Sequence, residues 1–157
     1  QLFEYKQMKR VDCNRGTSGI DGATSTAVGA SWVNEEMTIF ITGDMGFLYD
    51  SNALWSHYVT PKLKIVVMCN DGGGIFRFIQ GPSELPELEE FFETYRQVDV
   101  EGFARLHGFS CWSVFDEQAL QNVLPAFFAE KESASILAIH TPRKVNDCIL
   151  NGYFRRK

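Results

Sequence analysis

Two short apolar segments of the sequence end in small residues that carry oxygen atoms. The first, IFITGD, runs from Ile39 to Asp44, and the second, IVVMCN, runs from Ile65 to Asn70. One strand–helix–strand crossover joins them, and such a crossover returns the chain parallel to where it started. Neighbouring strands lie only about 4.8 Å apart. If these two strands are neighbours, Asp44 and Asn70 can therefore reach one small ligand above the same sheet edge, where open α/β sheets bind ligands.

The chemistry of these residues suggests a metal ion that carries a phosphate. Asp44 offers a carboxylate, Asn70 an amide oxygen, and the following glycine run (DGGGIF) a backbone carbonyl. Mg²⁺ prefers hard oxygen ligands of this kind and often shares them with substrate phosphates. Glycines also let backbone amides approach phosphate oxygens, because no Cβ intervenes. Gly43–Asp44 alone is more typical of an ordinary loop, but the pair at this spacing, with the glycine run, favours a site.

Composition and charge restrict the class of protein. The 157 residues are enough for one domain, and 45% hydrophobic residues can supply its core. The formal charge of −5 carries no basic footprint, which argues against nucleic-acid binding. No apolar run approaches the roughly 18 residues of a membrane span, and no signal peptide opens the sequence. The four cysteines match no metal or CxxC spacing, so we expect reduced, mostly buried thiols in a cytoplasmic protein.

Apolar segments alternate with helix-like segments along the chain. The expected strands lie near Arg10–Cys13 and at Met37–Thr42, Leu63–Cys69, Ser110–Phe115 and Ser135–His140. The expected helices are Gly22–Val33, Tyr49–Tyr58, Val100–His107, Glu117–Glu130 and one after Pro142. Gly108 suits a left-handed helix end, and Asp116 suits a helix N-cap. We expect a glycine-rich loop over 71–84 and a solvated acidic face over 84–93. The alternation predicts a parallel sheet covered by helices on both faces.

The residues at the two strand ends resemble the motif of thiamine-diphosphate-dependent enzymes. In that family Gly-Asp is followed, one crossover later, by Asn at a strand end. Met45 and Cys69 depart from the motif, which usually has Gly and Asn there. The resemblance is closest to the cofactor-binding domain of the 2-succinyl-5-enolpyruvyl-6-hydroxy-3-cyclohexene-1-carboxylate synthases of menaquinone biosynthesis. Three segments carry it: NRGTSGIDG (14–22), GDMGFLYDSNAL (43–54) and NDGGGIF (70–76).

The resemblance implies a fold and a set of site residues. It implies an α/β fold, a three-layer α/β/α sandwich around a six-stranded, mainly parallel sheet. The implied ligands of Mg²⁺ (or Mn²⁺) are Asp44, Asn70 and the Gly72 carbonyl. The implied contacts of thiamine diphosphate are Ser18, Gly19, Ile20, Gly43, Asp44, Met45, Gly46, Asn70, Gly72 and Gly73. The implied substrate contacts are Arg15, Ile75, Phe76 and Ile79.

Several of these roles have an ordinary structural alternative. Arg15 would grip a substrate carboxylate with two hydrogen bonds, but it could instead be a surface or capping arginine. Ile20 would hold the cofactor in its bent conformation, or it could simply pack in the core. The IFRFI segment could likewise be core, and Arg77 within it receives no role. For His57, His107 and His140 we expect structural roles.

The resemblance also implies that the active site is incomplete in this chain. Such a synthase decarboxylates 2-oxoglutarate and adds the resulting unit to isochorismate. Its activating glutamate lies in a pyrimidine-binding domain of a second subunit, and nothing in this sequence matches that domain. We therefore expect a domain excised from a larger chain, inactive alone, and a homo-oligomer (dimer or tetramer) when full-length. Two alternatives stay open: another thiamine-diphosphate lyase of the acetolactate synthase or decarboxylase type, and a non-catalytic flavodoxin-like domain.

Overall fold

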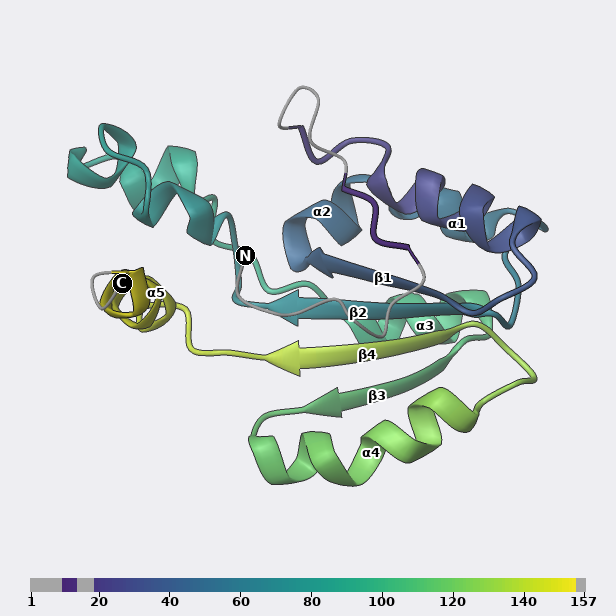
Figure 1. Ribbon diagram of the computed structural model, residues 1–157. Helices are drawn as coiled ribbons and strands as arrows, with labels where there is room; N and C mark the ends of the chain where they lie inside the picture. The colour runs from purple at the N-terminus through teal and green to yellow at the C-terminus, as the bar shows by residue number, and fades with distance from the viewer. Residues whose placement is uncertain (1–9, 14–18, 155–157) are drawn as a thin grey trace.

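The centre of the molecule is one parallel β-sheet. The structure is a computed structural model that describes residues 10–13 and 19–154. The strands are β1 (Thr38–Gly43), β2 (Leu63–Cys69), β3 (Ser110–Val114) and β4 (Ser135–His140). They lie in the order β1-β2-β4-β3, and all pairs are parallel. All four carboxyl ends therefore meet at one edge of the sheet (Figure 1).

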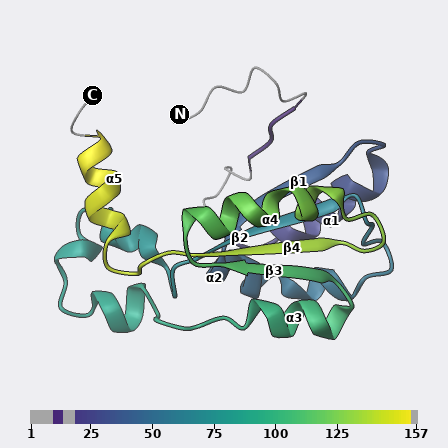
Figure 2. The same cartoon turned by 90° about the horizontal axis from the view of Figure 1, so that it is seen from below.

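Helices cover both faces of this sheet. They are α1 (Ala23–Val33), α2 (Asp44–Tyr49), α3 (Val100–His107) and α4 (Glu117–Ala129), whereas α5 (Asn146–Phe154) lies beyond the ends of the strands (Figure 1). Residues of α1, α2 and α3 share one core with Ile65 and Val67 of β2. On the other face Phe127 of α4 packs with Val114 and Leu137. Figure 2 shows α3 and α4 on opposite sides of the strands. The predicted three-layer α/β/α arrangement is confirmed.

The segment between β2 and α3 lies beyond the carboxyl ends of the strands, together with α5 (Figure 1). It contains only short helical turns. These are the 3₁₀ turns η2 (Gly74–Arg77) and η3 (Pro82–Glu84) and the π-helical turn η4 (Leu88–Phe92). The chain thus builds an irregular layer over the sheet edge at which ligands bind in open α/β folds.

Capping residues fix several helix ends. Asp116 accepts a hydrogen bond from the Ala119 N–H of α4 at 2.8 Å, as predicted, and Gly108 ends α3 in the left-handed conformation with φ 69°. The start of α1 is capped from another element. There Asp50 accepts hydrogen bonds from the N–H and the hydroxyl of Ser25, at 2.7 and 2.8 Å. Asp50 therefore fixes α1 against the turn that follows α2.

Three expectations about the elements were wrong. The sheet has four strands within the described residues rather than six. The segment 10–13 is exposed and has no regular structure; its alternating charged residues find no buried face, and Arg10 pairs instead with Asp12. The helix expected at 49–58 is replaced by α2 and a 3₁₀ turn, η1 (Ser51–Trp55). The chain breaks at Asp50, whose side chain is drawn to Ser25.

No helix in the described part of the chain is long and apolar enough to cross a membrane.

Candidate functional site

The ends of β1 and β2 bring Asp44 and Asn70 together. The two strands are parallel neighbours, with Gly43 beside Met68 in the register. As a result, the backbone N–H of Asn70 donates to Oδ2 of Asp44 at 3.0 Å. The predicted adjacency of these two strand ends is confirmed.

The Asp44 carboxylate is buried among backbone N–H groups. Its side chain is in the first turn of α2, and the residue is only 1% exposed. It accepts further hydrogen bonds from the N–H groups of Met45 at 2.8 Å and Asp71 at 2.7 Å. Burial raises its pKa, while these backbone hydrogen bonds oppose the rise. No lysine, arginine or histidine among residues 10–13 and 19–154 forms an ion pair with it. A divalent cation fits such a carboxylate, because a buried charge needs a partner.

The loop that contains the glycine run beside Asp44 has an unusual backbone, with little space for a side chain at Gly72. Asp71 has φ 62° and Gly72 has φ 148°, both in the left-handed half of conformational space. A Cβ on Gly72 would lie 2.7 Å from the backbone carbonyl oxygen of Glu93. The N–H of Gly73 donates to this same oxygen at 2.7 Å. The loop therefore packs tightly against Glu93, and only glycine fits at position 72.

Ile20 and Gly46 lie side by side near this edge. A Cβ built on Gly46 would be 2.9 Å from Thr42 Oγ1 and 3.8 Å from Ile20 Cβ. Ile20 itself is 46% exposed, so it is not a core residue in the described structure. Gly43 has open space where its Cβ would be. The backbone of Gly43 is therefore open to approach, and Ile20 lies close to Gly46 at the same end of the sheet.

The apolar residues of the IFRFI segment divide into two kinds. Ile75 is 60% exposed and Ile79 is also exposed, which argues against the core alternative for both. Phe76 instead packs edge-on against Phe92, with ring centroids 5.7 Å apart, and lies against Gly73. The predicted substrate role of these residues stays a prediction. Arg15 and Ser18, also predicted site residues, lie outside the described residues.

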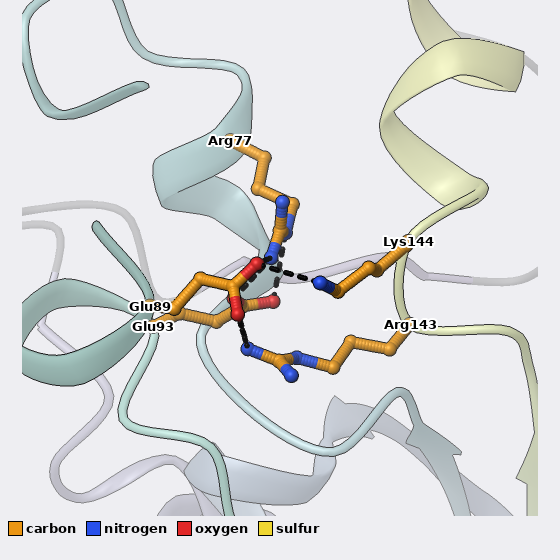
Figure 3. Close-up of polar contacts among 5 residues, drawn as sticks. All are labelled: Arg77, Glu89, Glu93, Arg143 and Lys144. Carbon is orange, nitrogen blue, oxygen red and sulfur yellow. Dashed lines mark hydrogen bonds and ion pairs between the residues drawn. The ribbon is translucent and has the colours of Figure 1, made fainter. Parts of the chain in front are cut away.

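A cluster of five charged residues joins this loop to the C-terminal segment (Figure 3). We call it the Glu93 cluster; it contains Arg77, Glu89, Glu93, Arg143 and Lys144. The acidic stretch was expected to be solvated, but Glu93 is fully buried. Burial opposes its ionisation, yet the hydrogen bonds from Arg77 and Arg143 outweigh this and lower its pKa. The one sequence signal was a glutamate directly after two phenylalanines, Phe91 and Phe92.

The cysteines differ in exposure. All four thiols are free, as expected, but only Cys69 is buried and Cys111 partly so, whereas Cys13 and Cys148 are exposed. The expectation of mostly buried thiols was therefore wrong. Burial, followed by the charges of Asp44 and Asp71, raises the pKa of Cys69 to about 12. Burial likewise raises the pKa of Cys111 to about 11.

These differences predict the order of thiol alkylation. With iodoacetamide at pH 8, Cys13 and Cys148 should react in the native protein, while Cys69 and Cys111 should stay unmodified, because the thiolate is the reactive form. Peptide mass spectrometry reads each site, and all four should react after denaturation in guanidinium. Rapid native labelling of Cys69 would contradict its place beneath the site.

Each of the three histidines lies beside an aromatic ring. The neighbours are Tyr58 for His57, Phe109 for His107 and Phe115 for His140. No group of three or more His, Cys, Asp or Glu side chains in the described ranges could hold a metal ion. The predicted ligand set contains one carboxylate, one amide and one backbone carbonyl, so it is not of that kind.

Comparison with known families agrees with this geometry. Residues 1–139 match the family described as thiamine pyrophosphate enzyme, C-terminal TPP binding domain. The chain belongs to this family. Membership removes the flavodoxin-like alternative, and the family's description names thiamine pyrophosphate as its ligand.

Particular relatives are similar over nearly the whole chain. A protein of Porphyromonas gingivalis named 2-succinyl-5-enolpyruvyl-6-hydroxy-3-cyclohexene-1-carboxylate synthase is 48% identical over 155 residues, 98% of this chain. A protein of Christiangramia forsetii with the same name is 44% identical over 154 residues, also 98% of this chain. In both cases the chain spans only 27% of the relative's length.

Solved structures show the same fold. A thiamine diphosphate-dependent 4-hydroxybenzoylformate decarboxylase of Rhodococcus jostii superposes with a TM-score of 0.59 at 21% identity, covering 74% of this chain and 22% of its own. Benzoylformate decarboxylase of Polynucleobacter necessarius gives 0.58 at 16% identity, covering 80% of this chain and 23% of its own. At these identities the likeness concerns the fold alone.

Proposed function

We propose that this chain is the cofactor-binding domain of a 2-succinyl-5-enolpyruvyl-6-hydroxy-3-cyclohexene-1-carboxylate synthase of menaquinone biosynthesis. The carrying observation is the buried Asp44 carboxylate, which forms no ion pair with a residue of the described ranges 10–13 and 19–154 and lies beside Asn70 and a glycine loop at adjacent strand ends. The identities of 44% and 48% to proteins with this name support the particular reaction.

In this proposal Asp44, Asn70 and the Gly72 carbonyl hold Mg²⁺ or Mn²⁺, and the metal neutralises the diphosphate of the cofactor. Gly43, Met45, Gly46 and Gly73 offer backbone that can approach the cofactor. Thiamine diphosphate supplies the carbanion chemistry when bound. Ile20, with Ser18 and Gly19 before it, would border the cofactor. Arg15, Ile75, Phe76 and Ile79 would border the substrates, 2-oxoglutarate and isochorismate.

The whole protein's activity needs more than this chain. The chain spans 27% of the relatives' length, and we propose that the activating glutamate lies in the pyrimidine-binding domain of a second subunit of a homo-oligomer. Large apolar side chains that stay exposed support a contact with other parts of such an assembly. They include Ile39 and Ile41 of β1 and Trp32 and Trp55 near α1. Four free thiols support a cytoplasmic location.

The test compares two substrates on the full-length protein. With thiamine diphosphate and Mg²⁺, it should release CO₂ from 2-oxoglutarate and, with isochorismate added, form the succinylated product seen by mass spectrometry. Pyruvate serves as the control, because acetolactate synthase or decarboxylase types would use it. The 157-residue chain alone should release no CO₂ above the protein-free rate. Preference for pyruvate, or turnover by the chain alone, would contradict the proposal.

A further inference from the structure

The Glu93 cluster contains a buried carboxylate held by two arginines from distant segments. Nε and an Nη of Arg77 donate to Glu93 at 2.9 and 2.6 Å, and Arg143 donates to it at 2.7 Å. Glu89, which is about half exposed, contacts the same two arginines and also Lys144. The three cations exceed the two anions by one charge. Glu93 therefore separates two guanidinium groups that would otherwise repel each other in a largely buried place.

The backbone of Glu93 supports the glycine loop directly. Its carbonyl accepts from the Gly73 N–H at 2.7 Å, and three residues later the Arg96 N–H donates to the Asp71 carbonyl at 3.2 Å. These two bonds align residues 93–96 with 71–73. The alignment determines where the Gly72 carbonyl lies, because Gly72 contacts Glu93 with no room for a side chain.

The same carboxylate joins the loop to the end of β4. Arg143 stands three residues after β4 and lies over the ring of Tyr95, 4.6 Å from its centroid. The Thr141 N–H donates to the carbonyl of Cys69, directly before Asn70, at 2.9 Å. The C-terminal segment is thus attached to both sides of the proposed metal-binding loop, through Cys69 and through Glu93.

We propose that Glu93 is a positioning residue for the cofactor loop: its side chain, clamped by Arg77 and Arg143, fixes its backbone carbonyl, and this carbonyl holds Gly72 and Gly73 in the conformation that receives the metal and the diphosphate. The identity of the ligand rests on the proposed function. The part of the proposal that concerns the loop conformation does not depend on the ligand. It also gives Arg77 a role, because Arg77 binds the carboxylate through two nitrogens, the geometry that fixes orientation best.

The experiment uses Glu93→Gln in the full-length protein, with Glu89→Gln as the matched control. Glu89 contacts the same cations, but within the described structure its backbone forms no hydrogen bond to residues 71–74. Without cofactor, E93Q should speed hydrogen exchange of the Gly73 N–H at least tenfold and leave Ile65 and Val67 in β2 unchanged. Equal acceleration at all three sites would mean a merely structural role and would overturn the proposal.

Cofactor binding provides the second measurement. E93Q should weaken calorimetric binding of thiamine diphosphate with Mg²⁺ roughly ten- to hundredfold, the effect of losing one charge-assisted contact. E89Q should change this affinity less than threefold.

If E93Q does not fold, Arg143→Met replaces it, with the exposed Arg105→Met as its control. R143M should weaken cofactor binding at least threefold, and R105M should not. Unchanged Gly73 exchange and affinity in a folded variant would refute the positioning role. Failure of the unmodified protein to bind cofactor would refute the proposed function instead. The hydrogen exchange of the Gly73 N–H would still show whether Glu93 holds the loop in its conformation.

Discussion

Replacing Asp44 with alanine should abolish Mg²⁺-dependent binding of thiamine diphosphate. The substitution removes the only charged group among the proposed ligands. It also leaves the N–H groups of Met45, Asn70 and Asp71 without their acceptor. Loss of a group that merely orients a metal ligand costs about 10- to 100-fold in affinity, so loss of the ligand itself should cost about 100-fold or more. Isothermal calorimetry of the full-length protein with thiamine diphosphate, with and without Mg²⁺, measures this.

Two control variants separate charge from structure. Asp44→Asn keeps most of the hydrogen-bonding shape and should lose metal dependence while keeping the fold. Asp116→Ala removes another carboxylate that accepts a backbone hydrogen bond at the start of a helix, here α4, and should leave binding unchanged. Undiminished cofactor binding by Asp44→Ala would eliminate the metal assignment.

Of the glycine-to-alanine substitutions in the loop, Gly72→Ala should lower the stability of the protein most. The residue has φ 148°, and the added Cβ would meet the Glu93 carbonyl at 2.7 Å. Backbone strain and overpacking together should lower the free energy of unfolding by roughly 2–4 kcal/mol. Urea unfolding of the chain measures the loss, and cofactor affinity should fall with it.

Gly29→Ala is the matched control for this substitution. Gly29 lies inside α1, and a Cβ there would meet nothing within 4 Å. Alanine favours a helix interior over glycine by about 0.5–1 kcal/mol, so this variant should be slightly more stable. Equal stability of G72A and G29A would show that the loop is not tightly packed against Glu93.

The sequence predicted correctly those strands whose bounds depend mainly on nearby residues. β2 and β4 were placed at their observed bounds, because both are mostly apolar segments and most of their residues become buried. The approach of Asp44 to Asn70 was also predictable, since a short crossover leaves few places for the second strand. Both features follow from rules that act within about 30 residues.

Other features depend on partners that no local pattern contains. Glu93 is buried because Arg77 and Arg143 reach it from positions 16 and 50 residues away. Its acidic neighbours made a solvated face the simpler expectation. The helix at 49–58 failed for the same reason, because Asp50 ends α2 while binding Ser25, 25 residues earlier. In each case a long-range polar contact overrode the local preference.

The order of the strands in the sheet affects how the domain folds during translation. Among the strands of the described residues β4 comes last in the sequence, yet it lies between β2 and β3. Lys64 of β2 therefore pairs with Ser135, a residue 71 positions later. On the ribosome, β2 therefore has an open hydrogen-bonding edge until residues 135–140 emerge. Open edges invite pairing with other chains, and pairings so distant along the sequence form slowly. A nascent chain interrupted before residue 135 would lack the strand that joins β2 to β3, and its β2 edge would stay open to pairing with other chains.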